Sequence, residues 1–145
     1  QYLGRVGTDP GRLLHTLVAD PHPIVRARAV AALARVGAPP RAFVRALDDE
    51  SMLVRHNAAE ALLSHINPNR ARAVVRERWD QGDFARPVIR LLHLQVLGRL
   101  GDDEVLLQAL ESPRSWAAWH ARQILNGRAH RWRHVTGNSP QNSTP

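Results

Sequence analysis

The sequence predicts an all-α fold made of about four helical hairpins in a row, and three observations predict it. Apolar residues recur at three- and four-residue spacing along almost all of the 145-residue chain, as they do on one face of an α-helix. Segments that alternate between apolar and polar residues, the pattern of half-buried strands, are absent. The helical pattern also repeats along the chain, which is typical of proteins built from stacked supersecondary units.

The repeat is clearest when residues 24–37, IVRARAVAALARVG, are laid over later segments. A shift of 29 residues places them on LVRHNAAEALLSHI, and a shift of 64 places them on VIRLLHLQVLGRLG. A shift of 92 brings them to WAAWHARQILNG. Four units therefore follow one another at spacings of 29, 35 and 28 residues, and each unit is long enough for two helices.

Prolines and glycines divide each unit into its two helices. Proline fits the first turn of a helix, and a glycine in the left-handed conformation commonly ends one. The prolines near first-helix starts are Pro10, Pro39, Pro40 and Pro68, and the glycines near second-helix ends are Gly37, Gly101 and Gly127. We expect first helices at about 10–19, 39–48, 68–80 and 102–111, and second helices at about 23–36, 51–65, 86–100 and 113–126.

The same pattern predicts the domain organisation. One repeat domain is expected over residues 10–127, with units at about 10–37, 39–66, 68–101 and 102–127. The run LGRVG at residues 3–7 lies thirty residues before LARVG at residues 33–37, so residues 1–9 are expected to end a preceding, truncated repeat. Residues 128–145, which contain three Arg and no acidic residue, are expected to form a basic and then polar tail.

The first two units share an acidic turn followed by V-R-x-x-A-x-x-A-L. In the first unit the turn begins at Asp20 and the V-R run at Val25. In the second unit they begin at Asp49 and Val54. The motif resembles the HEAT repeat and, in its short spacing, the bacterial HEAT-like variety. The resemblance implies a right-handed α-α superhelix, or α-solenoid, in which first helices form the convex side and second helices line a concave face.

The resemblance also implies a structural role for three arginines. In the family, an Arg in the first turn of the second helix bonds the Asp of a neighbouring turn and so joins repeats. Arg26, Arg55 and Arg90 occupy this place, and Asp20 and Asp49 stand where such partners belong. A ladder of phosphate-binding arginines is the alternative, which we rank lower because a buried Arg needs a carboxylate partner.

The helical period assigns one stripe of each second helix to the concave face. In the first unit, positions 25, 29, 32, 33 and 36 are expected to point inward, which leaves 27, 28, 31 and 35 exposed. The repeat offsets transfer this stripe to 56, 57, 60 and 64, to 91, 92, 95 and 99, and to 119, 120, 123 and 127.

The residues of this face that we expect to bind a partner are Arg28, His56, Asn57, Glu60, Leu91, Gln95, Arg99, Trp119, His120 and Gln123. Within the set, Leu91 and Trp119 would form an apolar spot with Leu92, and an apolar patch with a polar rim is typical of protein-binding surfaces. If the register is shifted by one residue, Leu91 and Leu92 belong to the core instead.

No catalytic or metal-binding pattern stands out. The chain has no Cys, no glycine-rich phosphate loop and no Gly-x-Ser-x-Gly elbow. None of its eight His is followed by Glu, which argues against the HEAT-like di-iron hydroxylases. We therefore expect no catalytic residues, no cofactor and no metal.

The leading interpretation is a non-catalytic scaffold or interaction module that binds a protein segment, or another domain of its own polypeptide, on the concave face. The alternative is a nucleic-acid binder, because the net charge is +7. Its basic residues would be those of the tail and Arg70, Arg72, Arg76, Arg78, Arg86 and Arg90. The segment RERWD at residues 76–80 is also faintly similar to HEAT-like alkylpurine DNA glycosylases.

Two further expectations concern origin and location. All twenty basic residues are Arg, with no Lys, and the chain is rich in Ala, which indicates a GC-rich genome more simply than a phosphate-binding surface. No apolar run approaches the ~18 residues of a membrane span. We expect a cytoplasmic protein without a membrane partner.

Overall fold

The computed structural model describes residues 9–111 and 115–136. In these ranges the chain forms eight α-helices and no strand. The helices are α1 (Pro10–Leu17), α2 (Pro23–Arg35), α3 (Pro40–Leu47), α4 (Met52–Ser64), α5 (Pro68–Gln81), α6 (Pro87–Arg99), α7 (Asp103–Leu110) and α8 (Trp116–Thr136).

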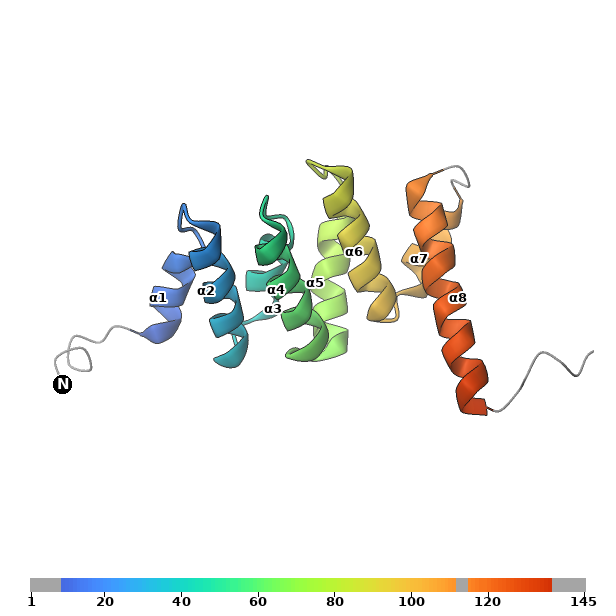
Figure 1. The fold of residues 1–145 in the computed structure, drawn as a ribbon, viewed down its shortest axis with the longest axis horizontal. Helices are drawn as coiled ribbons and strands as arrows, with labels where there is room; N and C mark the ends of the chain where they lie inside the picture. Colours follow the sequence, from blue (N-terminus) through green and yellow to red (C-terminus); the bar gives the residue numbers. More distant parts are fainter. Residues whose placement is uncertain (1–8, 112–114, 137–145) are drawn as a thin grey trace, which may run out of the picture.

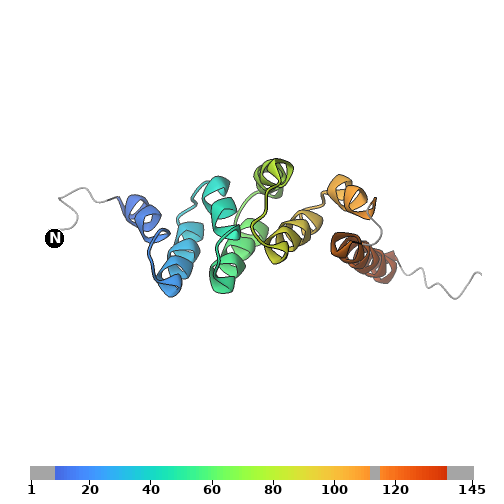
Figure 2. The ribbon, with the colours of Figure 1, turned by 90° about the horizontal axis from the view of Figure 1, so that it is seen from above.

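The helices form hairpins that stand side by side in a row (Figure 1). Seen from above, α1, α3, α5 and α7 make one layer and α2, α4, α6 and α8 make the other (Figure 2). Each helix packs on its hairpin partner, and α2 to α8 also pack on helices of neighbouring hairpins. The predicted all-α solenoid of helical hairpins is confirmed. None of the helices in the described ranges is both long and apolar enough to cross a membrane.

Helix starts follow from local chemistry. Five helices, α1, α2, α3, α5 and α6, have Pro in their first turn, where the missing N–H has no intrahelical partner to lose. At α1, α5 and α7 the side chain of the N-cap residue accepts hydrogen bonds from the first free backbone N–H groups. Asp9 accepts from Gly11 at 3.0 Å, Asn67 from Asn69 at 3.0 Å, and Asp102 from Val105 at 3.2 Å.

Two of the three predicted glycine stops end helices in the same way. Gly37 and Gly101 have φ of 72° and 86°, a left-handed conformation that costs glycine little. The next residue in each case donates its N–H back into the helix, from Ala38 to the Leu33 carbonyl at 3.1 Å and from Asp102 to the Leu97 carbonyl at 2.9 Å. This is the Schellman arrangement of helix ends.

The predicted stop at Gly127 is wrong, because α8 continues through it to Thr136. A single Gly costs about 1 kcal/mol in a helix, which neighbouring helix formers can offset. The residues that follow decide the outcome. Pro39 comes two residues after Gly37, and the N-cap residue Asp102 comes directly after Gly101, whereas RAHRWRHVT after Gly127 contains no breaker. Residues 128–136, expected in the tail, therefore extend the last helix.

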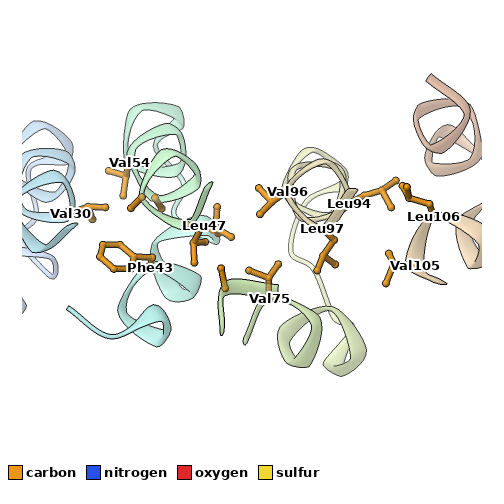
Figure 3. Close-up of a cluster of buried hydrophobic side chains, with 14 of the residues drawn as sticks. Val30, Phe43, Leu47, Val54, Val75, Leu94, Val96, Leu97, Val105 and Leu106 are labelled. Atoms are coloured by element: carbon orange, nitrogen blue, oxygen red, sulfur yellow. The ribbon is translucent and has the colours of Figure 1, made fainter. Parts of the chain in front are cut away.

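The core is a continuous row of apolar side chains between the two layers (Figure 3). First helices contribute Phe43, Leu47 and Val75, and second helices contribute residues such as Val30 and Leu97, all with almost no exposed surface. No single hairpin encloses its own apolar face. Each one is stable because its neighbours cover it, as expected for repeat proteins.

The predicted inward and outward stripes need two corrections. Ala27 was expected on the exposed stripe but is only 1% exposed, because the adjacent α4 covers it. Val36 was expected inward but is 57% exposed, because it is the C-cap residue where α2 ends. Leu91 and Leu92 are half-buried against the core, so they lie between the two predicted alternatives, the exposed stripe and the core.

Candidate interaction surface

The residues predicted to bind a partner all lie on second helices, in the layer formed by α2, α4, α6 and α8. They differ in how much surface they leave free. The exposed members are Arg28, His56, Glu60, Arg99, Trp119 and Gln123, and the half-buried members are Asn57, Leu91, Gln95 and His120.

A groove of about 700 Å³ runs along this layer between α4 and α6 and reaches α8 at Ile124. Four of the predicted residues line it, namely His56, Leu91, Gln95 and Arg99. Leu92, predicted on the same stripe, also lines it. The lining residues that were not predicted for this face are Met52, Arg55, Ala59, Leu63, Val88, Val96 and Ile124. Arg28, Trp119 and the other predicted residues lie outside it.

The groove results from uneven repeat spacing. The second helices α2 and α4 pack closely along their length, whereas α4 and α6 touch at few points. Between them, α5 has 14 residues, compared with 8 in α1, α3 and α7, and a loop with two positive φ values, at Gly82 and Asp83, follows it. The 35-residue spacing seen in the sequence thus separates α4 from α6, and α6 is set back between α4 and α8 (Figure 2).

The groove combines an apolar floor with a basic rim. Its floor is formed by aliphatic side chains of α4 and α6, and Met52, at one end, is 76% exposed. The polar residues of the lining are the buried Arg55 and, at the rim, His56, Gln95 and Arg99, and none of the described lining residues is acidic. Glu60 lies outside the lining and is 3.7 Å from His56. The rim therefore favours a ligand with negative charge.

Asn57 has a structural contact that the helical pattern does not reveal. Its side-chain Nδ2 donates a hydrogen bond of 2.9 Å to the backbone carbonyl of Ala27 in α2. That carbonyl lies in the preceding repeat, so the Asn57 amide joins α2 to α4. A partner would have to compete with this bond to use Asn57.

Arg26 and Asp49 are brought together across neighbouring repeats. The Arg26 Nε and Nη2 atoms donate to the two Asp49 carboxylate oxygens at 3.0 and 3.1 Å, which is a bidentate pair. The hydrogen bond with Asp49 raises the pKa of Arg26 above its usual value. The Arg26 Nη1 also donates to the backbone carbonyls of Asp20 and Pro21 at 2.9 and 3.0 Å. The Arg26 side chain thus joins the turn before α2 to the turn between α3 and α4.

Among the described residues, Arg55 repeats only the backbone part of this arrangement, and Arg90 repeats neither part. Arg55 is almost buried and donates to the backbone carbonyls of Asp49 and Glu50 at 2.8 and 2.9 Å. Arg90 is exposed, and its guanidinium lies 5.3 Å from the ring centroid of Trp79. The Asp20 carboxylate accepts the backbone N–H of His22 at 2.8 Å. The different loop after α5 removes the Asp that would match Asp49.

Another Arg, which the repeat motif does not include, joins the third and fourth hairpins. Arg76 in α5 lies 3.0 Å from Asp80, 3.1 Å from Asp102 and 3.4 Å from Glu104. The hydrogen bond with Asp80, followed by those with Glu104 and Asp102, raises the pKa of Arg76. The spacing of Arg76 and Asp80 by four residues was a visible signal, but the contact with Asp102 depends on packing.

A partly buried polar cluster joins α3, α5 and α6. Arg78 Nε donates to Asp48 Oδ2 at 2.7 Å, and His93 Nε2 lies 3.2 Å from Asp48 Oδ1 without hydrogen-bond alignment. The His93 Nδ1 atom is 2.9 Å from the Ile89 carbonyl oxygen. Burial lowers the pKa of His93. The shift of 64 residues places His93 at the inward position of Ala29, so the repeat indicated its burial, whereas its contact with Asp48 depends on packing.

These contacts also bear on the arginines proposed for nucleic-acid binding. Arg76 and Arg78 are engaged by carboxylates. Arg70, Arg86 and Arg90 are exposed. The side chains of the tail residues Arg131 and Arg133, and the residues before Asp9, lie outside the described part. Among described residues, no three His, Asp or Glu lie close enough to hold a metal ion.

Comparisons with known proteins give one match. The family model of HEAT repeats matches residues 11–92, which is more than half of the chain. No curated protein and no solved structure matches this chain.

Proposed function

The chain belongs to the HEAT-repeat family, and from that premise we propose that it is a non-catalytic interaction module whose α4–α6 groove binds an apolar protein segment flanked by acidic residues. The observation that carries the proposal is the groove itself, which joins an apolar floor to an acid-free rim. The segment belongs to a partner protein or to another domain of the same polypeptide.

The dimensions of the groove suit a short helix or strand. Each of α4 and α6 has 13 residues, which corresponds to about 20 Å of helix. A partner helix of about three turns would present apolar residues at spacings of three and four to the floor. Its acidic residues would then lie next to Arg99 and His56. An apolar surface with a polar rim is the usual character of such binding sites.

Peptide selection on phage tests the proposal directly. Random 15-residue peptides are selected against the protein, and the enriched peptides are titrated against Arg99→Glu and Arg45→Glu. Both residues are exposed, and both changes have the same charge, but Arg99 lines the groove and Arg45 lies in α3 in the other layer. We expect Arg99→Glu to weaken binding about tenfold or more, because it repels acidic peptide residues.

The control decides how the result is interpreted. Arg45→Glu should bind the same peptides as the unchanged protein within about twofold, since long-range charge effects are largely screened at physiological salt. Enriched peptides that bind both variants equally well would contradict the assignment of the groove.

Nucleic-acid binding is the alternative. The positive charge of the exposed residues Arg70, Arg86 and Arg90 and of the basic stretch at the end of α8 supports it. The carboxylates at Arg76 and Arg78 reduce that support. If this alternative holds, duplex or single-stranded DNA binds at about 50 mM salt and is largely released by about 200 mM.

A further inference from the structure

A second cavity, of about 490 Å³, lies at the start of α6, between α6 and α8. Two indole side chains, Trp79 and Trp116, stand at it, and the buried Leu94 lies at its floor. Arg86 and Arg90 complete the rim. The cavity borders the α4–α6 groove, with which it shares the lining residues Val88 and Leu91. Its volume lies within the range of about 300–1,000 Å³ that is usual for small-molecule sites.

One aromatic side chain of the cavity is held in place by a chain of ring contacts. Trp79 lies 5.8 Å from Phe84, measured between ring centroids, and Phe84 lies 4.9 Å from the buried ring of His93. Arg78 covers Phe84 with its guanidinium 4.3 Å from the ring centroid. This side of the cavity is therefore formed in advance, so a ligand does not have to order it.

The other aromatic side chain lacks cover. Trp116 is 80% exposed, and its only described ring partner is His120 at 5.9 Å. An indole left in water gains free energy when a flat apolar surface covers it, and stacked aromatic pairs gain more than their buried area alone provides. Trp116 thus favours a planar ring as its ligand.

The charges of the cavity are all positive. Arg90 is already placed 5.3 Å from the Trp79 ring, and Arg86 is exposed at the N-cap of α6. No described lining residue is acidic. Guanidinium groups bind carboxylates with paired hydrogen bonds. We propose that this pocket binds a planar aromatic ring that carries a carboxylate, with the ring on the two indoles and the carboxylate at Arg86 and Arg90.

The test uses 2-naphthoate as the probe and NMR signals of the four indole N–H groups as the readout. The Trp79 and Trp116 signals should move on titration, with a dissociation constant on the order of 1 mM or lower for a ligand of this size. The Trp119 signal should stay in place. Trp119 is 55% exposed on the same helix but does not line the pocket, so it is a matched reporter.

Two chemical controls separate the ring from the charge. A naphthyl ring with an aminomethyl group in place of the carboxylate should bind about tenfold more weakly, because it meets two guanidinium groups. Cyclohexanecarboxylate, which has the charge but no aromatic ring, should also bind about tenfold more weakly. An acetylated Trp-Asp amide, which carries an aromatic ring and a carboxylate on a peptide, is titrated beside 2-naphthoate. The probe that binds more tightly shows whether the natural ligand is a peptide or a free aromatic acid.

Variants complete the test and keep it independent of the groove. Trp116→Ala should weaken 2-naphthoate about tenfold and Arg90→Gln about fivefold, whereas Trp119→Ala and the groove variant Arg99→Gln should change it by less than about twofold. The proposal is overturned if the amine binds as well as the carboxylate, or if Trp116→Ala binds like the unchanged protein. Neither result would affect the peptide proposal.

Discussion

At the scale of single residues, the ring of His93 is completely buried in α6, and both of its nitrogens face oxygen atoms. Nδ1 is 2.9 Å from the Ile89 carbonyl oxygen and Nε2 is 3.2 Å from Asp48 Oδ1. A neutral imidazole has only one N–H, so one nitrogen meets an acceptor without a proton between them. Burial has the largest effect and lowers the pKa of His93. The Ile89 carbonyl and the Asp48 carboxylate favour the protonated ring and raise this pKa, and Arg78 lowers it further.

A stability change with pH follows from the lowered pKa of His93. Between about pH 6.5 and the lower folded-state pKa, the unfolded chain binds a proton at this position and the folded chain does not. The free energy of unfolding should therefore fall as the pH drops from about 6.5 towards the lower folded-state pKa, by at most ~1.4 kcal/mol per pH unit, and then level off. Urea unfolding measured between about pH 7.5 and pH 5 gives this slope.

The variant His93→Gln should lose that part of the pH dependence, because Gln does not titrate. His56→Gln, at an exposed position of α4, is the control and should keep it. An unchanged slope in His93→Gln would show that another group causes the acid sensitivity.

At the scale of the helix, the three glycines near the predicted ends of second helices behave differently. Gly37 and Gly101 end their helices with positive φ, whereas Gly127 lies inside α8. An added Cβ at Gly101 or Gly127 would meet no atom within 4 Å. Packing is therefore equally permissive at the two sites, and only the backbone conformation separates them.

Replacing each glycine with Ala should change stability in opposite directions. Gly101→Ala should lower the free energy of unfolding by about 1–2 kcal/mol, the cost of a left-handed conformation for a residue with a Cβ. Gly127→Ala should raise it by up to about 1 kcal/mol, because Ala favours a helix interior. Urea unfolding of both variants measures the two effects, and the same sign for both would contradict the helix ends described here.

At the scale of the whole molecule, the hairpins are coupled only through their neighbours. Arg26 and Asp49 join the first hairpin to the second, and Arg76 and Asp102 join the third to the fourth. At the far end, Arg128 of α8 pairs with Asp103 of α7. In such a row, local opening depends on the nearest interfaces, so a weakened interface should affect the adjoining helices most.

Hydrogen exchange of Asp49→Asn tests this local coupling. Loss of the Arg26 pair should speed amide exchange in α1 and α2 by about fivefold or more, while α7 and α8 change little. Asp103→Asn is the matched control, because it removes a carboxylate at the other end and should affect α7 and α8 only. Uniform acceleration along the chain in either variant would mean that the repeats unfold as one unit.

Much of the fold could be predicted from the sequence because its signals are local. Proline at the first turn and glycine before a breaker mark helix ends, and the expected bounds of α1 to α7 agree with the structure to within two residues. The stop at Gly127 failed for the same reason, since a lone glycine is a weak signal without Pro or an N-cap after it. Ala27 and Val36 failed because the stripe rule ignores neighbouring repeats and helix ends.

The sequence by itself determined that this chain is a row of helical hairpins and which faces of them are apolar, since hydrophobic periodicity and capping act over a few residues. Only the tertiary structure decided which side chains meet over 20 to 30 positions, such as Arg78 with Asp48 and Arg76 with Asp102. It also decided that α4 and α6 stand apart to form a groove, and that Trp79 and Trp116 share a pocket. These features depend on the distance and angle between repeats, which result from the packing of all the side chains between them.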